Sequence, residues 1–439
     1  MSSMRNRILR IVHREHGQTL VMFVLMIAVL IGFVGLGVDL GFAYISRAKL
    51  SKAVDAACLN GMRNYYQGTA QASLVASNTF LLNYGSCGRD VAPPSLNINF
   101  TKDANNDTIL NVTATVAINT FFIRVLPAIG GYSWKTLTVG DTAQATRTKV
   151  YLALALDRSG SMDPSRGPSP MGDGSGSGGG YYLPGAVATF INFFSDSIDE
   201  ASMASFASTA SQDISMEQPF KSDITKAAYA LTNHWCGGTF SQGGLTNALV
   251  QENNITIPSS QVALQVVVFF TDGLANMIQD TLSCPGSITW NFGGQDSGTS
   301  VGFWNVATTT TSCSDQNNAC GDGSSLRGCS PACSATQFYS NQNGTMESFT
   351  RANVTAEAKY RCIQVAQQMQ SENILVYAIG LGGSSGVNMD FLSQVANATN
   401  SPTYNASAPT GLALLADDPS QLQAYFTAVA NDILYRLTQ

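Results

Sequence analysis

Residues 150–162 read VYLALALDRSGSM, an apolar run that passes directly into a short polar segment. The apolar part has the length of a fully buried β-strand, and such a strand delivers its last residue to the carboxyl edge of its sheet, where open α/β folds place their ligands. At that edge Asp157, Ser159 and Ser161 alternate along the chain, so their side-chain oxygens can gather around one point. The stretch predicts an α/β fold with a polar site beyond the end of this strand.

Two further polar residues extend the candidate site. Thr239 follows two glycines, and Asp272 comes shortly after a second apolar run, residues 262–270. Two carboxylates and three hydroxyls suit a hard cation such as Mg²⁺, which prefers oxygen ligands and keeps some of its waters. The alternative is a loop that hydrogen-bonds to itself, as Asp and Ser commonly do at turns. The hexapeptide alone does not decide between the two, but with Thr239 and Asp272 the pattern favours a metal site.

The order Asp-x-Ser-x-Ser, a distant Thr and a later strand-terminal Asp resembles the metal-ion-dependent adhesion site of von Willebrand factor A (vWA) domains. The resemblance implies a Rossmann-like, doubly wound, mainly parallel sheet for this part of the chain. It also implies that Ser159, Ser161 and Thr239 bind Mg²⁺ (or Mn²⁺ or Ca²⁺) directly, while Asp157 and Asp272 act mostly through water. One coordination position would then stay open for an acidic residue of a protein partner.

The N-terminus of the chain predicts a membrane anchor. Residues 19–38 contain no charged side chain. A helix of about 20 residues spans about 30 Å, which matches one bilayer core. Four arginines precede this run and Asp39 follows it, so the positive-inside rule keeps residues 1–18 in the cytoplasm and exports the rest. A cleaved signal peptide is the competing interpretation, but the apolar run is longer than the usual apolar part of a signal peptide. A buried core helix is disfavoured because the run is apolar without interruption.

The same region carries a second resemblance. The chain reads GQTLV from residue 17 and VDLGFAY from residue 38, and it continues with RAKL and AVDAA. This run resembles the N-terminal segment of TadG-like proteins of the bacterial Tad (Flp) pilus assembly system. The resemblance implies a single-pass anchor in the bacterial inner membrane, a C-terminal vWA domain, and pilus or Tad-machinery components as partners. Related pseudopilins have Glu at the fifth position after the cleavage glycine, whereas Met22 stands there in this chain, which favours retention of the anchor.

Pattern changes along the chain suggest its organisation. Apolar and small residues after the anchor (Leu40, Tyr44, Ala48 and residues 53–57) suggest a stalk helix with one packed face. Alternating strands and helices in the last two thirds predict a parallel sheet covered on both faces. We expect a cytoplasmic tail (1–18), a transmembrane helix (19–38), a helical stalk (39–91), a small β-rich, pilin-like α+β region (92–148) and a vWA domain (149–439).

Two insertions interrupt the vWA pattern, and both leave the metal-site edge. Residues 163–180 are rich in Gly and Ser, which predicts a mobile loop. Residues 274–350 hold five of the nine cysteines, and we expect them to form a crosslinked cap or flap beside the site. Disulfides are favoured because exported cysteines usually oxidise, although a four-cysteine zinc site stays open. The odd number of cysteines leaves at least one thiol free or paired between chains.

Composition and missing motifs argue against other functions. Only 12% of residues are charged and the net charge is −6. No basic surface for nucleic acid is therefore indicated. The chain has no Gly-x-Ser-x-Gly, His-Glu-x-x-His or Walker motif, and His234 is the single histidine outside the cytoplasmic tail, so we expect no enzyme. The predicted function is metal-dependent protein binding in assembly or anchoring of a Tad-type pilus, or in adhesion through it. The alternatives are a stand-alone surface adhesin, an exported metallohydrolase, and a structural envelope protein with an empty site.

Overall fold

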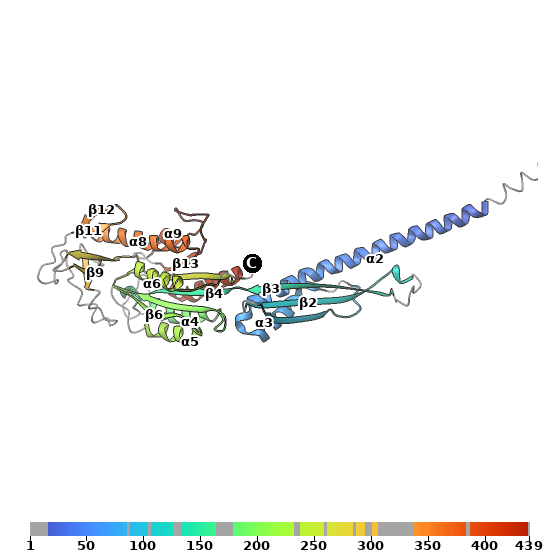
Figure 1. Cartoon of the computed structure of the whole chain (residues 1–439), viewed down its shortest axis with the longest axis horizontal. Helices are drawn as coiled ribbons and strands as arrows, with labels where there is room; N and C mark the ends of the chain where they lie inside the picture. Colours follow the sequence, from blue (N-terminus) through green and yellow to red (C-terminus); the bar gives the residue numbers. More distant parts are fainter. Residues whose placement is uncertain are drawn as a thin grey trace, which may run out of the picture. The chain divides into compact units, whose positions relative to one another are not determined.

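The chain folds into two compact units, with the boundary between residues 147 and 148. We call residues up to 147 the N-terminal unit and residues 148–437 the C-terminal unit (Figure 1). Each unit has its own hydrophobic core. The computed structural model describes residues 16–85, 88–103, 107–125, 134–163, 179–231, 238–258, 261–283, 287–294, 301–305, 337–348, 350–382 and 387–437.

The N-terminal unit packs two helices against a small antiparallel sheet. Helix α2 (His16–Arg63) is followed by the short turn η1 (Tyr65–Gln67) and by α3 (Thr69–Tyr84), which packs back against α2. The chain reverses there because Gly68 adopts a φ of 93°, a conformation that other residues rarely take. The sheet has the order β1-β2-β3, with β1 at Ser95–Lys102, β2 at Thr108–Asn119 and β3 at Thr136–Arg147.

The first half of α2 is exposed. Among the described residues, one helix is long and apolar enough to cross a membrane, and only 6% of its apolar window is buried inside the protein. That exposure separates this helix from the buried core helix of a soluble domain, which passes the same length and composition test. An N-terminal apolar helix, as the sequence predicted, is therefore present in the fold.

The second half of α2 packs on the sheet with a face that agrees only in part with the predicted one. Leu40 is 51% exposed and Tyr44 is 76% exposed, so the prediction is wrong for these two residues, whereas Ala53, Val54 and Ala57 are buried as predicted. The buried residues recur every three or four positions, which keeps them on one side of the helix. They are mostly small because β2 and β3 approach closely, and they are Asp39, Ala43, Ser46, Leu50, Ala53, Val54, Ala57, Cys58, Gly61 and Met62.

The C-terminal unit contains a six-stranded mixed sheet of order β14-β13-β7-β4-β5-β6. All neighbouring strands pair in parallel except β5 and β6, so β6 is an antiparallel edge. Counted in chain order within this sheet, the strands lie as 6-5-4-1-2-3, which is the order of doubly wound sheets. The strands are β4 (Lys149–Asp157), β5 (Glu200–Phe206), β6 (Ala210–Glu217), β7 (Ala263–Thr271), β13 (Leu375–Leu381) and β14 (Ala413–Ala416).

Helices cover both faces of this sheet (Figure 1). On one face α6 (Ser241–Asn253), α8 (Arg351–Ser371) and α9 (Met389–Val395) pack on a cluster that includes Ala153 and Phe269. On the other face, α4, α5 and α10 pack together, and the ring of Phe426 contacts those of Phe190 and Phe270. These helices span Gly179–Ile191, Lys221–Ala230 and Leu422–Arg436. The predicted mixed α/β architecture is confirmed.

The two insertions are described only in part. The second one begins with the antiparallel strands β8 (Met277–Ser283), β9 (Ser287–Gly294) and β10 (Val301–Asn305), and ends with the hairpin of β11 (Gln337–Ser340) and β12 (Thr345–Ser348). Most of the Gly/Ser-rich insertion and all five clustered cysteines lie outside the described residues, so the predictions of a mobile loop and of disulfides stay predictions. His234 also lies outside them. Among the described residues, Cys58 and Cys362 are free and buried.

Candidate metal centre

The predicted site residues lie where the sheet reverses its winding. Strands β4 and β7 are parallel neighbours, with Leu156 paired to Phe270, so both strands end at the same edge. Asp157 is the last residue of β4, and Asp272 directly follows the last residue of β7. In doubly wound sheets this switch point between the first and fourth strands is the place where ligands bind.

A tight turn folds the two serines back over the end of β4. The backbone N–H of Ser159 donates to Asp157 Oδ1 over 2.7 Å, and the turn η4 (Gly160–Met162) then reverses the chain. As a result, the hydroxyls of Ser159 and Ser161 lie 3.0 Å apart, and Ser161 Oγ donates to Asp272 Oδ1 over 2.7 Å. Ser159 Oγ lies 3.4 Å from the same carboxylate oxygen. Four of the five predicted residues thus meet in one cluster.

Thr239 reaches the cluster from the loop before α6. A Cβ built on Gly273 would lie 3.3 Å from Thr239 Oγ1 and 3.8 Å from Ser161 Oγ, so both hydroxyls flank the same glycine just after Asp272. The threonine loop is held by Asn276, whose Oδ1 accepts the N–H of Thr239 over 2.7 Å and whose own N–H donates to the Thr239 carbonyl over 3.1 Å. All five predicted residues are therefore at this edge.

The glycine before Thr239 is required by the same contact. A Cβ on Gly238 would lie 2.7 Å from Met277 Cγ and 3.0 Å from Asn276 Oδ1. Only glycine, which has no Cβ, lets the two loops approach this closely. The N–H of Gly238 also donates to Ser208 Oγ over 3.0 Å. Close packing of two loops, rather than flexibility, explains the glycine at position 238.

The cluster concentrates negative charge in a buried place. Asp157 and Asp272 are 0% and 1% exposed. Burial raises the pKa of Asp157 to about 6, although the hydroxyl of Thr271 and the N–H of Ser159 stabilise its charged form. Burial raises the pKa of Asp272 further, and the negative charge of Asp157 adds to this effect. Without a compensating cation, these two carboxylates destabilise each other.

One carboxylate oxygen of the cluster stands out among the described residues. Within the part of the chain that the structure describes, Asp272 Oδ2 is buried and has no hydrogen-bond partner. A buried unpartnered carboxylate oxygen is costly, so such a group needs an explanation. The surrounding donors are carboxylate and hydroxyl oxygens, the ligand set of Mg²⁺, Mn²⁺ and Ca²⁺ rather than of thiolate-bound metals. The residues present fit a hard divalent cation.

Sequence reasoning missed two residues that support this geometry. Thr271 donates its hydroxyl to Asp157 Oδ2 over 2.5 Å and so joins the ends of β4 and β7. Asn276 holds the Thr239 loop as described above. Thr271 stands next to Asp272 in Thr-Asp-Gly, which was a usable signal, whereas Asn276 lies in a loop without periodicity and carries no signal of its own.

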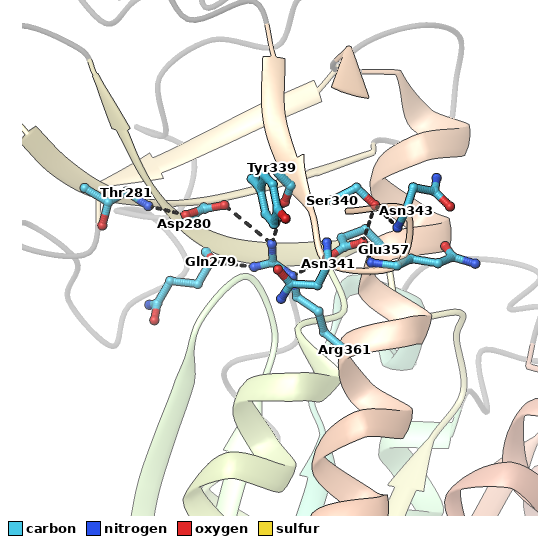
Figure 2. A network of polar contacts seen from close by, with 10 residues as sticks. Gln279, Asp280, Thr281, Tyr339, Ser340, Asn341, Asn343, Glu357 and Arg361 are labelled. Atoms are coloured by element: carbon cyan, nitrogen blue, oxygen red, sulfur yellow. Dashed lines mark hydrogen bonds and ion pairs between the residues drawn. The ribbon is translucent and has the colours of Figure 1, made fainter. Parts of the chain in front are cut away.

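The strand that follows Asn276 is tied to α8 by a buried polar network (Figure 2). Arg361 points from α8 toward β8 and β11, and its guanidinium donates to the carbonyls of Gln279 and Tyr339 over 2.9 and 3.0 Å. Asp280 Oδ2 lies 3.4 Å from Arg361 Nη2. Both described ends of the second insertion are therefore attached to one arginine.

Glu357, one turn earlier on α8, completes the network. Its carboxylate lies 2.6 Å from Arg361 Nε and accepts the N–H groups of Asn341 and Gln342 over 2.8 and 3.1 Å (Figure 2). The Ser340 hydroxyl donates to it over 2.8 Å. Burial alone would raise the pKa of Glu357, but the arginine and these donors outweigh it, so the pKa is lowered and the charged form is stabilised.

Comparisons with known proteins give one family match and several distant structural similarities. Residues 17–64 match the family model described as "Putative Flp pilus-assembly TadE/G-like". No curated protein matches the chain. The structure is similar to the vWF domain of the type V pili tip protein Mfa5 from Porphyromonas gingivalis, with 15% identity, a TM-score of 0.40, and coverage of 67% of this chain and 98% of that one.

Two other solved structures are similar, also at low sequence identity. The PilB minor pilin from Streptococcus sanguinis has 14% identity and a TM-score of 0.41, with 78% of this chain and 79% of that chain covered. Proximal thread matrix protein 1 from the mussel byssus, solved with a zinc-occupied MIDAS motif, has 14% identity and a TM-score of 0.35 over 66% of this chain. The present chain spans 46% of that protein. By the family match, the N-terminal segment of this chain, residues 17–64, is a TadE/G-like Tad domain.

Proposed function

We propose that this chain is a membrane-anchored component of a Tad-type pilus system whose C-terminal unit is a vWA domain that binds a protein partner through a divalent cation. The Tad domain at residues 17–64 supports the pilus association. The apolar helix supports anchoring, with residues 1–18 in the cytoplasm and the remainder outside the inner membrane of a bacterium. The proposed role is in assembly or anchoring of the pilus, or in adhesion through it, and it is binding rather than catalysis.

The observation that carries the metal site is the Asp272 oxygen that has no hydrogen-bond partner in the described part of the chain. It lies in a buried cluster with Asp157, Ser159 and Ser161, and the Thr239 hydroxyl is adjacent. We propose that the three hydroxyls hold the cation directly and that the two carboxylates act mostly through water. When bound, the cation supplies positive charge and a coordination position for an acidic side chain of the partner.

The residues around the cation site have distinct proposed roles. Thr271 and the N–H of Ser159 hold the Asp157 carboxylate in one orientation, and Asn276 holds Thr239 at the edge. These contacts are made by the protein's own groups, so they hold Asp157 and Thr239 in place for the cation. Such preorganisation lowers the free-energy cost of binding.

A capture experiment on the full chain tests this function. Tagged protein is purified from bacterial membranes with and without a chelator, and co-purified proteins are identified. We expect a partner that is lost with chelator and restored by Mg²⁺, and lost in Thr239→Ala. Thr246→Ala is the matched control, because this exposed threonine lies on α6 and its hydroxyl contacts only the Gln242 carbonyl over 2.8 Å among the described residues.

Two results would contradict the proposed binding mode. If the same partners are captured with and without chelator, or if Thr239→Ala captures as the parent does, metal-dependent binding is wrong. Protease added to spheroplasts tests the anchor separately. Digestion should remove a tag at the C-terminus and spare a tag at residue 1, and protection of the C-terminal tag would contradict the proposed topology.

A further inference from the structure

The first described residues of the connection between β2 and β3 are fixed to the membrane helix by a buried carboxylate. Asp39, on α2, is 2% exposed and accepts the backbone N–H groups of Phe121, Phe122 and Ile123, each over 2.8 Å. Arg89 lies 4.0 Å from the same carboxylate and adds a compensating positive charge. Three donors on one carboxylate hold residues 121–123 at one position along the helix.

The position of this contact along α2 places the connection at the end of the apolar run. Asp39 is the first charged residue after residues 19–38. Gly35, one helical turn earlier, is buried, and a Cβ built on it would lie 2.4 Å from Phe122 Cβ. Measured along the helix axis, Phe122 therefore lies against α2 about 6 Å closer to its N-terminal end than Asp39, beside the apolar run.

The aromatic side chains of this connection are exposed, although they are large and apolar. Phe121 is 60% exposed and Phe122 is 43% exposed. Trp134, which precedes β3, is 45% exposed, and the Thr120 hydroxyl donates to its carbonyl over 2.5 Å, so the two ends of the connection are held together. Arg124 beside them is exposed as well.

An arrangement of this kind matches the membrane–water interface. Aromatic side chains concentrate at the headgroup level of bilayers, with basic residues among them. On α2, Phe33, Leu36 and Val38 are exposed at the same level, so the aromatic side chains extend an apolar surface that the membrane helix already presents. A bilayer that covers the helix up to residue 38 necessarily reaches Phe122.

We propose that Phe121, Phe122 and Trp134, which we call the aromatic tip, insert into the extracytoplasmic interface of the lipid bilayer and hold the N-terminal unit against the membrane. This inference rests on the proposed membrane anchoring of α2. The occupant is lipid rather than a protein, because the tip continues the surface that the bilayer covers. The unit is thereby attached at two points, the helix and the tip.

Photocrosslinking in native membranes tests the aromatic tip. The full chain is made with p-benzoylphenylalanine at position 121, and irradiated protein is analysed for the mass of a lipid adduct. Position 33, inside the apolar run, is the positive control, and position 82 is the negative control, because Leu82 lies on α3 and is 86% exposed. We expect the lipid adduct at position 121 to be within about threefold of position 33 and about tenfold above position 82.

The outcomes separate this inference from the anchoring on which it rests. Lipid adducts at position 33 but not at position 121 would overturn the aromatic tip and leave the anchor intact, whereas no adduct at position 33 would overturn the anchor. Crosslinks from position 121 to a protein in place of lipid would overturn the tip as a lipid contact and show that a partner covers it. In Asp39→Ala the tip loses its attachment, so adducts at position 121 should fall while those at position 33 stay unchanged.

Discussion

Replacing Asp157 with Asn should stabilise the metal-free protein and abolish its response to Mg²⁺. The substitution removes a buried charge but keeps the shape of the side chain. Its amide oxygen can still accept the N–H of Ser159, and its NH₂ group faces Thr271 Oγ1, which is able to accept as well as donate. Two buried carboxylates that lack a compensating cation repel each other, so removal of one charge should relieve that repulsion.

The magnitude follows from the burial of Asp157. Its pKa is raised from 3.8 to about 6. Each pKa unit corresponds to about 1.4 kcal/mol. Because the pKa is higher in the folded state, the favourable contribution is fully present below pH 3.8 and lost as the pH rises through 6. At pH 7 the ionised carboxylate therefore lowers the free energy of unfolding by about 3 kcal/mol, and the Asp157→Asn variant would recover up to this amount.

Thermal unfolding of the full chain in detergent, with and without Mg²⁺, measures both effects. At pH 7 without metal, Asp157→Asn should raise the Tm by about 6 °C, and at pH 4 the difference should disappear. Saturating Mg²⁺ at about 100 times its Kd should stabilise the parent by about 2.7 kcal/mol and the variant not at all. A variant that is less stable than the parent at pH 7, or that still responds to Mg²⁺, would refute the reasoning.

Asp199→Asn is the matched control. Asp199 is buried and accepts the N–H of Val150 over 3.0 Å and that of Ser195 over 2.7 Å, at the opposite end of β4 from the metal site. Asn has one acceptor oxygen for these two donors, so one buried N–H loses its partner. We expect this variant to lose about 1–3 kcal/mol of stability and to keep its response to Mg²⁺.

Three further outcomes follow from the structure. Asn276→Ala removes the acceptor that positions the Thr239 loop, so calorimetry should show Mg²⁺ affinity reduced about tenfold, and an unchanged affinity would mean that the loop holds itself. In Glu357→Gln, the stability measured by urea unfolding should fall less as the pH is lowered. The lowered pKa of Glu357 contributes stability that is present above its unfolded pKa and lost as the pH falls through its folded pKa. The same loss of stability at low pH in variant and parent would contradict this. If the seven cysteines other than Cys58 and Cys362 form three disulfides, three thiols should react under denaturing, non-reducing conditions, whereas reaction of nearly all nine would exclude disulfides.

The central part of the fold could be predicted from sequence because its strands are buried on both faces. Strands β4 and β7 are continuous apolar runs, which parallel sheets require. Strand β6 was not predicted, since it is a partly exposed antiparallel edge with the polar sequence ASQDISME. The packed face of α2 was predicted wrongly at Leu40 and Tyr44, which face outward, because the close approach of the sheet selects small residues such as Ala43 and Ser46 there.

For the candidate site, the meeting of the two aspartates could be predicted from the sequence, but the contacts that support it could not. Side chains at the ends of parallel strands must meet at one edge, so the approach of Asp157 and Asp272 follows from the two apolar runs alone. The supporting contacts were not predictable in the same way. Asn276 acts through its hydrogen bond to Thr239. Whether these two residues meet depends on how two loops fold in space, and this leaves no pattern in the sequence.

The attachment of the second insertion to Arg361 has a consequence for how this chain can diverge. With Gln279 and Tyr339 held by the same guanidinium, the intervening segment begins and ends at neighbouring points. The entropy of closing such a loop grows only logarithmically with its length, so doubling the segment costs about 0.6 kcal/mol. Relatives can therefore exchange or lengthen this segment while β7 and the oxygen cluster at its end keep their geometry.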